Sequence, residues 1–141
     1  VVELQKVVSE LYFRIISLPK TENYLNESIE KFVTEEDWNI IHDGIRDKLG
    51  EHDDFLEVQD ERYGESDYAA VVNLSEYLSD IYQDVKDFIM AFRIGSQEIM
   101  HDAIWEIIQS FEAFWGQKIA NTLKAVHNLV YLPDLEEGEE E

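Results

Sequence analysis

Apolar residues recur with helical spacing through almost all of residues 75–132, and this pattern limits the folds open to the chain more than any other feature. A short segment, residues 93–96, interrupts it. The first half has its apolar face at Leu74, Leu78, Ile81, Tyr82, Val85, Phe88, Ile89 and Phe92, and the second at Met100, Ile104, Ile107, Ile108, Phe111, Trp115, Ile119, Val126 and Val130. Such spacing is typical of one face of an α-helix. A short link between two long helices makes them antiparallel neighbours, so the stretch predicts a helical hairpin.

Another amphipathic helix is expected at the start of the chain, over residues 2–18. Pro19 ends it, because proline cannot continue a helix. Its apolar face contains Leu4, Val7, Val8, Leu11, Ile15 and Leu18. Phe13 and Ile16 lie away from that face, so the last two turns are expected to be buried on more than one side. Residues 20–31 form a polar connector without a sustained period.

The next helix has clear signals at both ends. Thr34 is a good N-cap residue, and Asp37 stands three positions later, close to the pattern of a capping box. Gly50 is placed to serve as the C′ residue. Between them, Trp38, Ile41, Ile45 and Leu49 form a single apolar stripe. These signals predict a helix that begins after Thr34 and ends at Leu49.

Residues 51–73 are the least regular part of the chain, with eight acidic side chains opposed by Arg62 alone. A β-hairpin across Tyr63 and Gly64 is one alternative, but the apolar and polar residues alternate poorly. The segment is therefore predicted to be a long acidic loop, which in a compact domain is either functional or mobile. Gly116 falls inside the last helix, where it predicts a local bend or a close approach of helices.

The predicted fold class is all-α: an antiparallel bundle or small array of four to five helices around the long C-terminal hairpin. Residues 1–132 are expected to form a single helical domain, and residues 133–141 an acidic C-terminal tail. The chain begins with Val1 and not with Met, so we expect that its true start has been removed. The fifth helix of the alternative would then precede Val1.

The charge balance excludes several classes of partner. With 32 acidic and 11 basic residues, the net charge of −21 repels phosphate backbones and anionic lipid, so we expect no nucleic acid and no membrane as partner. Basic proteins, divalent cations and neutral ligands stay open, although the acidity also serves solubility alone. There is no Cys, no signal-peptide pattern and no apolar run of membrane-spanning length. We expect a cytoplasmic protein.

Four carboxylates follow one another along the first helix of the hairpin, at Glu76, Asp80, Asp84 and Asp87. At about 100° per residue they form a strip roughly opposite the apolar face, with Asp84 closest to the boundary. Such a strip can hold Mg²⁺ or Mn²⁺ if a facing helix supplies further oxygen atoms. The favoured interpretation is a solvated face, because the strip points away from the predicted core.

The second helix of the hairpin carries Glu98 and His101 in a Glu-x-x-His motif. Di-iron carboxylate bundles use two such motifs with two further Glu residues, and this chain has one copy. A histidine at the boundary of the core is therefore the favoured role of His101. These positions, with Asp80, Asp84, Asp87 and Asp102, are the candidate metal ligands; no catalytic residue and no cofactor are predicted.

Three His-Asp dipeptides also occur, at residues 42–43, 52–53 and 101–102. Metal-dependent phosphohydrolases of the His-Asp helical type use such a pair, but Asp43 and Asp102 are expected to project away from the apolar faces of their helices.

All-α nucleotide pyrophosphatases need a Glu-x-x-Glu and a Glu-x-x-Asp on successive helices. Here Asp84 and Asp87 have that spacing, whereas Glu98 and Asp102 are four residues apart.

Three stretches carry a resemblance to a known family: residues 32–38 (FVTEEDW), 78–88 (LSDIYQDVKDF) and 114–118 (FWGQK). They resemble an uncharacterised bacterial family, a domain of unknown function found mainly in Bacteroides-type bacteria, over most of the chain from the first helix to about Tyr131. The resemblance implies a small helical cytoplasmic protein, whose relatives are longer at the N-terminus. It implies no activity, cofactor or site residues.

The sequence thus leaves the function unknown, with two hypotheses. The leading one is a non-enzymatic helical domain that binds another protein, or itself, through an exposed part of its apolar helices or through the acidic loop. The alternative is a divalent-metal-dependent phosphohydrolase of an all-α type, built on the candidate metal ligands. The second requires their carboxylates to converge on one concave pocket.

Overall fold

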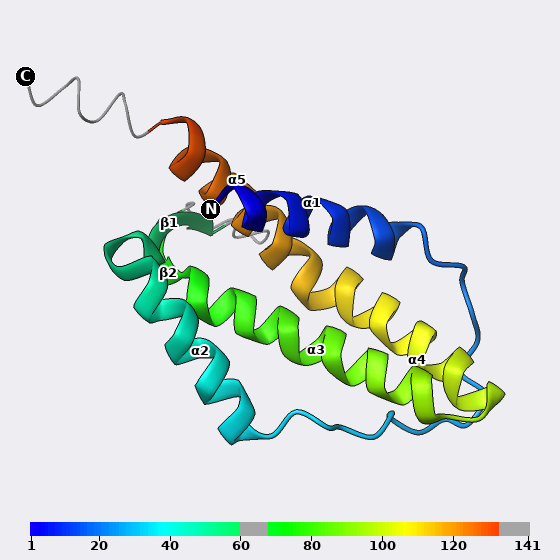
Figure 1. The fold of residues 1–141 in the computed structure, drawn as a ribbon. Coiled ribbons are helices and arrows are strands. Elements are labelled where there is room, and N and C mark those ends of the chain that lie inside the picture. Colours follow the sequence, from blue (N-terminus) through cyan, green and yellow to red (C-terminus); the bar gives the residue numbers. More distant parts are fainter. Residues whose placement is uncertain (60–67, 133–141) are drawn as a thin grey trace, which may run out of the picture.

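The computed structural model describes residues 1–59 and 68–132 (Figure 1). Its helices are α1 (Val2–Ile16), α2 (Glu35–Leu49), α3 (Leu74–Ile94), α4 (Gln97–Ser110) and α5 (Gly116–Tyr131), with a 3-10 turn η1 (Gly50–Asp53) after α2 and a π-helical turn η2 (Phe111–Trp115) between α4 and α5. The predicted all-α class and the long C-terminal hairpin are confirmed. One arm of the hairpin is α3, and the other is α4, η2 and α5 in succession.

The long helix α3 lies at the centre of the fold. It contacts α2 on one side and α4 and α5 on another, while α1 packs along α5 (Figure 1). The connector, residues 17–34, runs past the turn between α3 and α4 to reach the start of α2. The buried core that these helices share contains Val8, Ile15, Ile81, Ile107, Phe111, Trp115 and Ile119. All seven lie on apolar faces that the sequence pattern predicts.

The ends of α2 are built as predicted. The Thr34 hydroxyl accepts a hydrogen bond from the Asp37 N–H, and the Asp37 carboxylate accepts one from the Thr34 N–H, which completes a capping box. At the other end Gly50 has a φ of +56°, and its N–H donates to the Arg46 carbonyl. A positive φ favours glycine, so this residue stops the helix where the sequence indicates.

Gly116 marks the end of the π-helical turn η2. Its N–H donates to the Phe111 carbonyl, five residues back and not the usual four. A Cβ atom at position 116 would lie 2.6 Å from that carbonyl oxygen. The close approach that glycine permits is therefore within its own helix, and it allows the backbone to accommodate one extra residue in the turn.

A small hairpin replaces part of the predicted acidic loop. Strands β1 (Asp54–Gln59) and β2 (Tyr68–Asn73) pair antiparallel, with Leu56 opposite Val71. The prediction of a loop is wrong for these two ranges. Apolar side chains lie on both faces of the ribbon, since Phe55 packs edge-on against Tyr77 of α3 while Leu56 is exposed, and this hides the alternation expected of a strand. The turn considered at Tyr63 and Gly64 lies outside the described residues.

Candidate interaction surface and buried carboxylates

The carboxylate strip of α3 is not a solvated face. Asp87 is only 2% exposed, and its Oδ1 accepts hydrogen bonds from the Phe32 N–H at 2.7 Å and the Val33 N–H at 2.9 Å. Glu76, the first member of the strip, is exposed as predicted. The prediction is wrong for Asp87 because the connector crosses this side of α3. Its extended backbone has no helix or sheet partner there, and the carboxylate satisfies two of its N–H groups.

Two acidic residues of α4 hold the connector in the same way. Asp102 is 3% exposed and accepts from the Tyr24 N–H at 2.6 Å and the Leu25 N–H at 3.0 Å. Glu106 accepts from the Ile29 N–H at 2.9 Å and pairs with the Lys31 ammonium at 3.1 Å. Asp102 does project away from the apolar face of its helix, as predicted, but it points into the connector and not into solvent. Glu106 was missed, although it stands one turn after Asp102 on a helix beside a polar connector.

The middle members of the strip have partners from other helices. Asp80 accepts from the Trp38 indole N–H at 3.0 Å and from the Lys118 ammonium at 2.9 Å. Asp84 accepts from the Ser110 hydroxyl at 2.9 Å. Burial raises the pKa of Asp84, while the Ser110 hydrogen bond and the Lys31 charge act in the opposite direction. These contacts make Asp80 and Asp84 links between helices.

Asp84 should therefore respond to pH. A raised pKa means that burial disfavours the charged carboxylate in the folded state, so neutral Asn at this position should stabilise the fold at pH 7. We expect Asp84→Asn to increase the free energy of unfolding by less than about 1 kcal/mol, because the carboxyl is part-exposed. The gain should disappear below pH 3.8, the ordinary pKa, where the wild-type carboxyl is neutral in both states. Urea unfolding at pH 7 and pH 3 measures both effects; equal gains at the two pH values would contradict the expectation.

The remaining candidate ligands do not gather around one point. Glu98 is exposed, and His101 is part-buried, with its ring 5.5 Å from the Tyr24 ring in an edge-on contact. Within residues 1–59 and 68–132, no group of three or more His, Asp and Glu side chains is placed to hold a metal ion. His101 thus has the surroundings of a histidine at the boundary of the core.

Two of the three His-Asp pairs meet through one serine. Asp53 is buried and accepts from the Ser75 N–H and the Ser75 hydroxyl, both at 2.7 Å, at the start of α3. The Ser75 hydroxyl also lies 3.3 Å from Nε2 of His42, whose ring stacks on Trp38. Because Ser75 is fully buried, this arrangement stabilises the helix terminus and presents no accessible nucleophile. The third pair lies near the other end of α3.

A groove between α1 and α3 is a concave surface whose lining is almost entirely apolar. Its volume is about 280 Å³. The lining residues are Leu4, Val7, Val8 and Leu11 of α1, Leu78, Ile81, Tyr82, Val85, Lys86 and Ile89 of α3, and Ile119 of α5. Lys86 is the one charged side chain in this lining, and no ion-pair partner for it occurs in the described part of the chain. The groove therefore offers apolar contacts with one positive charge at the edge.

Two further cavities have more polar linings than the groove between α1 and α3. One of about 350 Å³ lies between the connector and the turn at Gly95. The other, about 610 Å³, lies between the small hairpin and α5, where Glu57 accepts hydrogen bonds from the Tyr77 hydroxyl and the Asn121 amide. Burial, with the Glu57 hydrogen bond and charge, raises the pKa of Tyr77. Tyr77 thus stays a neutral donor.

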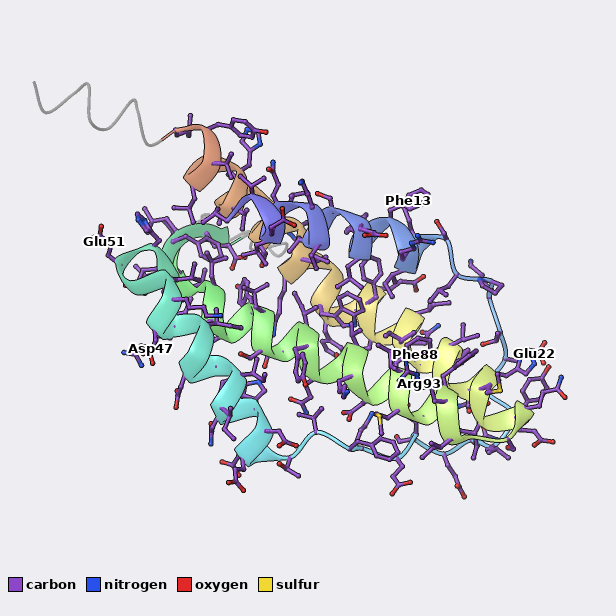
Figure 2. All side chains as sticks on the ribbon, in the orientation of Figure 1. Phe13, Glu22, Asp47, Glu51, Phe88 and Arg93 are labelled. Carbon is purple, nitrogen blue, oxygen red and sulfur yellow. The ribbon has the colours of Figure 1, made fainter. Side chains whose placement is uncertain are left out.

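The outer surface of α1 is the second apolar feature. Phe13 is 62% exposed and Ile16 is 59% exposed, so the prediction that the last two turns of this helix are buried on more than one side is wrong. Phe13 projects from α1 on the side away from α3 (Figure 2). No other described element covers it, because the connector leaves α1 at Ser17 and runs past its end.

The comparisons with known proteins show what the chain is related to. The family model "Domain of unknown function (DUF5063)" matches residues 1–132. The chain belongs to this family. The DUF5063 chain is also similar to protein BF1032 from Bacteroides fragilis, a structural genomics target with a crystal structure: the two share 38% identity and a TM-score of 0.79 over 92% of this chain and 74% of that one. The predicted resemblance to a Bacteroides-type family is confirmed. No curated protein matches.

The family brings no activity, so the surface features decide which function to test. No helix in the described ranges is long and apolar enough to cross a membrane. Lys86 is a groove residue that the sequence analysis did not name, although the sequence carries a signal for it. It is a basic residue among the carboxylates of α3, at a position next to the apolar face.

Proposed function

We propose that this chain is a non-enzymatic interaction domain that accepts an amphipathic helix of another protein in the groove between α1 and α3. The observation that supports it best is the groove itself, whose lining is apolar except for Lys86. Val7, at its edge, is 59% exposed, although apolar side chains of this kind are usually buried in a soluble domain. A groove walled by side chains of two helices suits a third helix laid between them.

The lining also indicates the chemistry of the partner. A bound helix would place apolar anchors at i, i+3 or i+4, and i+7 against side chains such as Leu11, Leu78 and Val85. Lys86 would meet a carboxylate on the edge of the bound helix. The chain as a whole is strongly acidic, so the partner should carry its own carboxylates close to its apolar stripe and not over its whole surface.

A photoreactive amino acid placed at Val7 tests the proposal in living cells. Irradiation should join the chain to a second protein, because the bound helix would lie within reach of this position. The same substitution at Ile40 of α2, which is 63% exposed, is the matched control and should give no adduct. With the captured partner purified, Lys86→Glu should weaken binding about tenfold, since it replaces attraction by repulsion. Absence of a Val7 adduct would contradict the proposal.

A metal titration tests the non-enzymatic part of the proposal. The alternative phosphohydrolase needs Asp80, Asp84 and Asp87 to act together with Glu98, His101 or Asp102 on a divalent cation. Four of these carboxylates already accept hydrogen bonds from protein donors. We therefore expect no change in melting temperature with millimolar Mg²⁺, Mn²⁺ or Zn²⁺. A cation at a hundred times its Kd would stabilise the fold by about 2.7 kcal/mol, and such a rise would favour the enzyme.

A further inference from the structure

The helix α1 has a second apolar face, opposite the one that it buries. Val2, Phe13 and Ile16 are exposed large apolar residues, and Ser9 is exposed between them. At about 100° per residue these four positions lie within a sector of about 60°, on the side away from Leu4 and Leu11 of the groove. This outer face of α1 is defined here as Val2, Gln5, Ser9, Phe13 and Ile16. It is distinct from the groove, so it does not serve the partner helix proposed above.

The charges of α1 differ from those of the rest of the molecule. The 15 residues of α1 include two acidic and two basic ones, a net charge of zero, in a chain whose total is −21. Lys6 pairs with Glu3 at 3.4 Å and Arg14 with Glu10 at 3.3 Å, in two exposed ion pairs. Exposed pairs of this type contribute little to stability, so their members are free to form other pairs. The outer face of α1 is thus an apolar surface without the repulsion that the remainder of the chain would impose.

We propose that the outer face of α1 is the contact of a symmetric dimer, in which α1 of a second copy packs antiparallel across it. With the two-fold axis at Ser9, Val2 of one copy lies opposite Ile16 of the other, and Gln5 lies opposite Phe13. Ser9 meets its own equivalent, and its small side chain permits a close approach. A single surface that matches itself in this way is what a two-fold interface requires.

The flanking charges agree with the same register. Lys6 and Glu10 lie on one edge of the outer face, and in an antiparallel pair of helices this edge meets the same edge of the other copy. Lys6 of each copy then faces Glu10 of the other, which gives two symmetric ion pairs. In a parallel arrangement this edge would meet the opposite edge of the other copy, at Gln5 and Tyr12, where neither Lys6 nor Glu10 finds an opposite charge. Charge complementarity therefore selects the antiparallel dimer.

The size of the contact sets its strength. A helix of 15 residues is about 22 Å long, so an interface made by α1 alone stands at the lower end of specific protein interfaces. We expect micromolar association. Because the bodies behind α1 are acidic in both copies, the dimer should be stronger at about 0.2 M salt than at about 0.02 M, where their repulsion is less screened.

Sedimentation equilibrium over micromolar to millimolar protein tests this dimer. Phe13→Ser should raise the dissociation constant about a hundredfold, because each dimer buries two such rings. Ile40→Ser, at an equally exposed position on α2, should leave the constant unchanged. A monomer throughout this range would overturn the proposal, and so would a dimer that Phe13→Ser does not weaken.

A charge exchange tests the register without removing any apolar contact. Lys6→Glu and Glu10→Lys should each raise the dissociation constant about tenfold, because each creates two like-charged contacts across the axis. The double variant Lys6→Glu with Glu10→Lys should restore the wild-type constant, since the pairs form again with exchanged signs. A double variant as weak as the single ones would overturn the antiparallel arrangement. Both residues are exposed, and circular dichroism verifies that each variant is folded.

Discussion

Asp87→Ala should lower the free energy of unfolding by about 3 kcal/mol. The substitution removes the acceptor of the Phe32 and Val33 N–H groups at a position that is nearly inaccessible to water. A part-buried N–H that loses its partner costs about 1–3 kcal/mol, and the hydrogen bonds lost here are to a charged acceptor. Urea unfolding followed by circular dichroism at pH 7 measures the effect.

Glu76→Ala is the matched control for this prediction. Both residues are carboxylates of α3, but Glu76 is exposed and holds no part of the connector. Its substitution should change the unfolding free energy by less than about 0.5 kcal/mol. Equal effects of the two substitutions would show that the Asp87 contacts do not stabilise the connector. Asp87→Asn should lie between them, because it retains a carbonyl acceptor but loses the charge.

Trp115→Ala should have the largest effect of any single substitution considered, about 4 kcal/mol. Trp115 is 1% exposed, belongs to the shared core, and contacts the Phe111 ring edge-on at a centroid distance of 4.9 Å. Truncation of a buried aromatic residue removes its transfer free energy and leaves a cavity. Thermal and urea unfolding give the loss directly.

The neighbouring Phe114 provides the control. It belongs to the same π-helical turn but is 71% exposed, so Phe114→Ala should cost less than about 1 kcal/mol. Trp115→Phe should cost less than Trp115→Ala, since the buried indole N–H has no hydrogen-bond acceptor among the described residues and its removal leaves no partner unsatisfied. Similar losses for the two alanine variants would contradict the described orientation of the turn.

Prediction from the sequence succeeded where a local pattern carries the physical information. The apolar period of residues 75–132 depends only on which side chains share one face of a helix, and it predicted the hairpin. Thr34 with Asp37 and Gly50 act within a few residues of backbone, and they mark the ends of α2. A hairpin was an alternative for residues 51–73 but a loop was favoured, because adjacent apolar residues such as Val71 and Val72 hide the period of a strand.

The carboxylates show the limit of this reasoning. A helical wheel uses only the positions of residues along one helix. On their own helices Asp87 and Asp102 lie off the apolar face, as predicted. Their partners are backbone N–H groups of the connector, more than 50 residues away in sequence. Every residue except proline has such a group, so the residue types in the connector give no indication of which N–H groups these carboxylates bind.

The apolar surfaces divide in the same way. The positions of Leu4, Leu11, Phe13 and Ile16 along one helix are enough to predict that α1 is apolar on two sides. The packing of the other helices sets which side of α1 is buried and leaves the groove beside Lys86 open, and neither could be read from the sequence. The physical reason is that periodicity records which side chains share a face, whereas burial depends on which other element lies against that face.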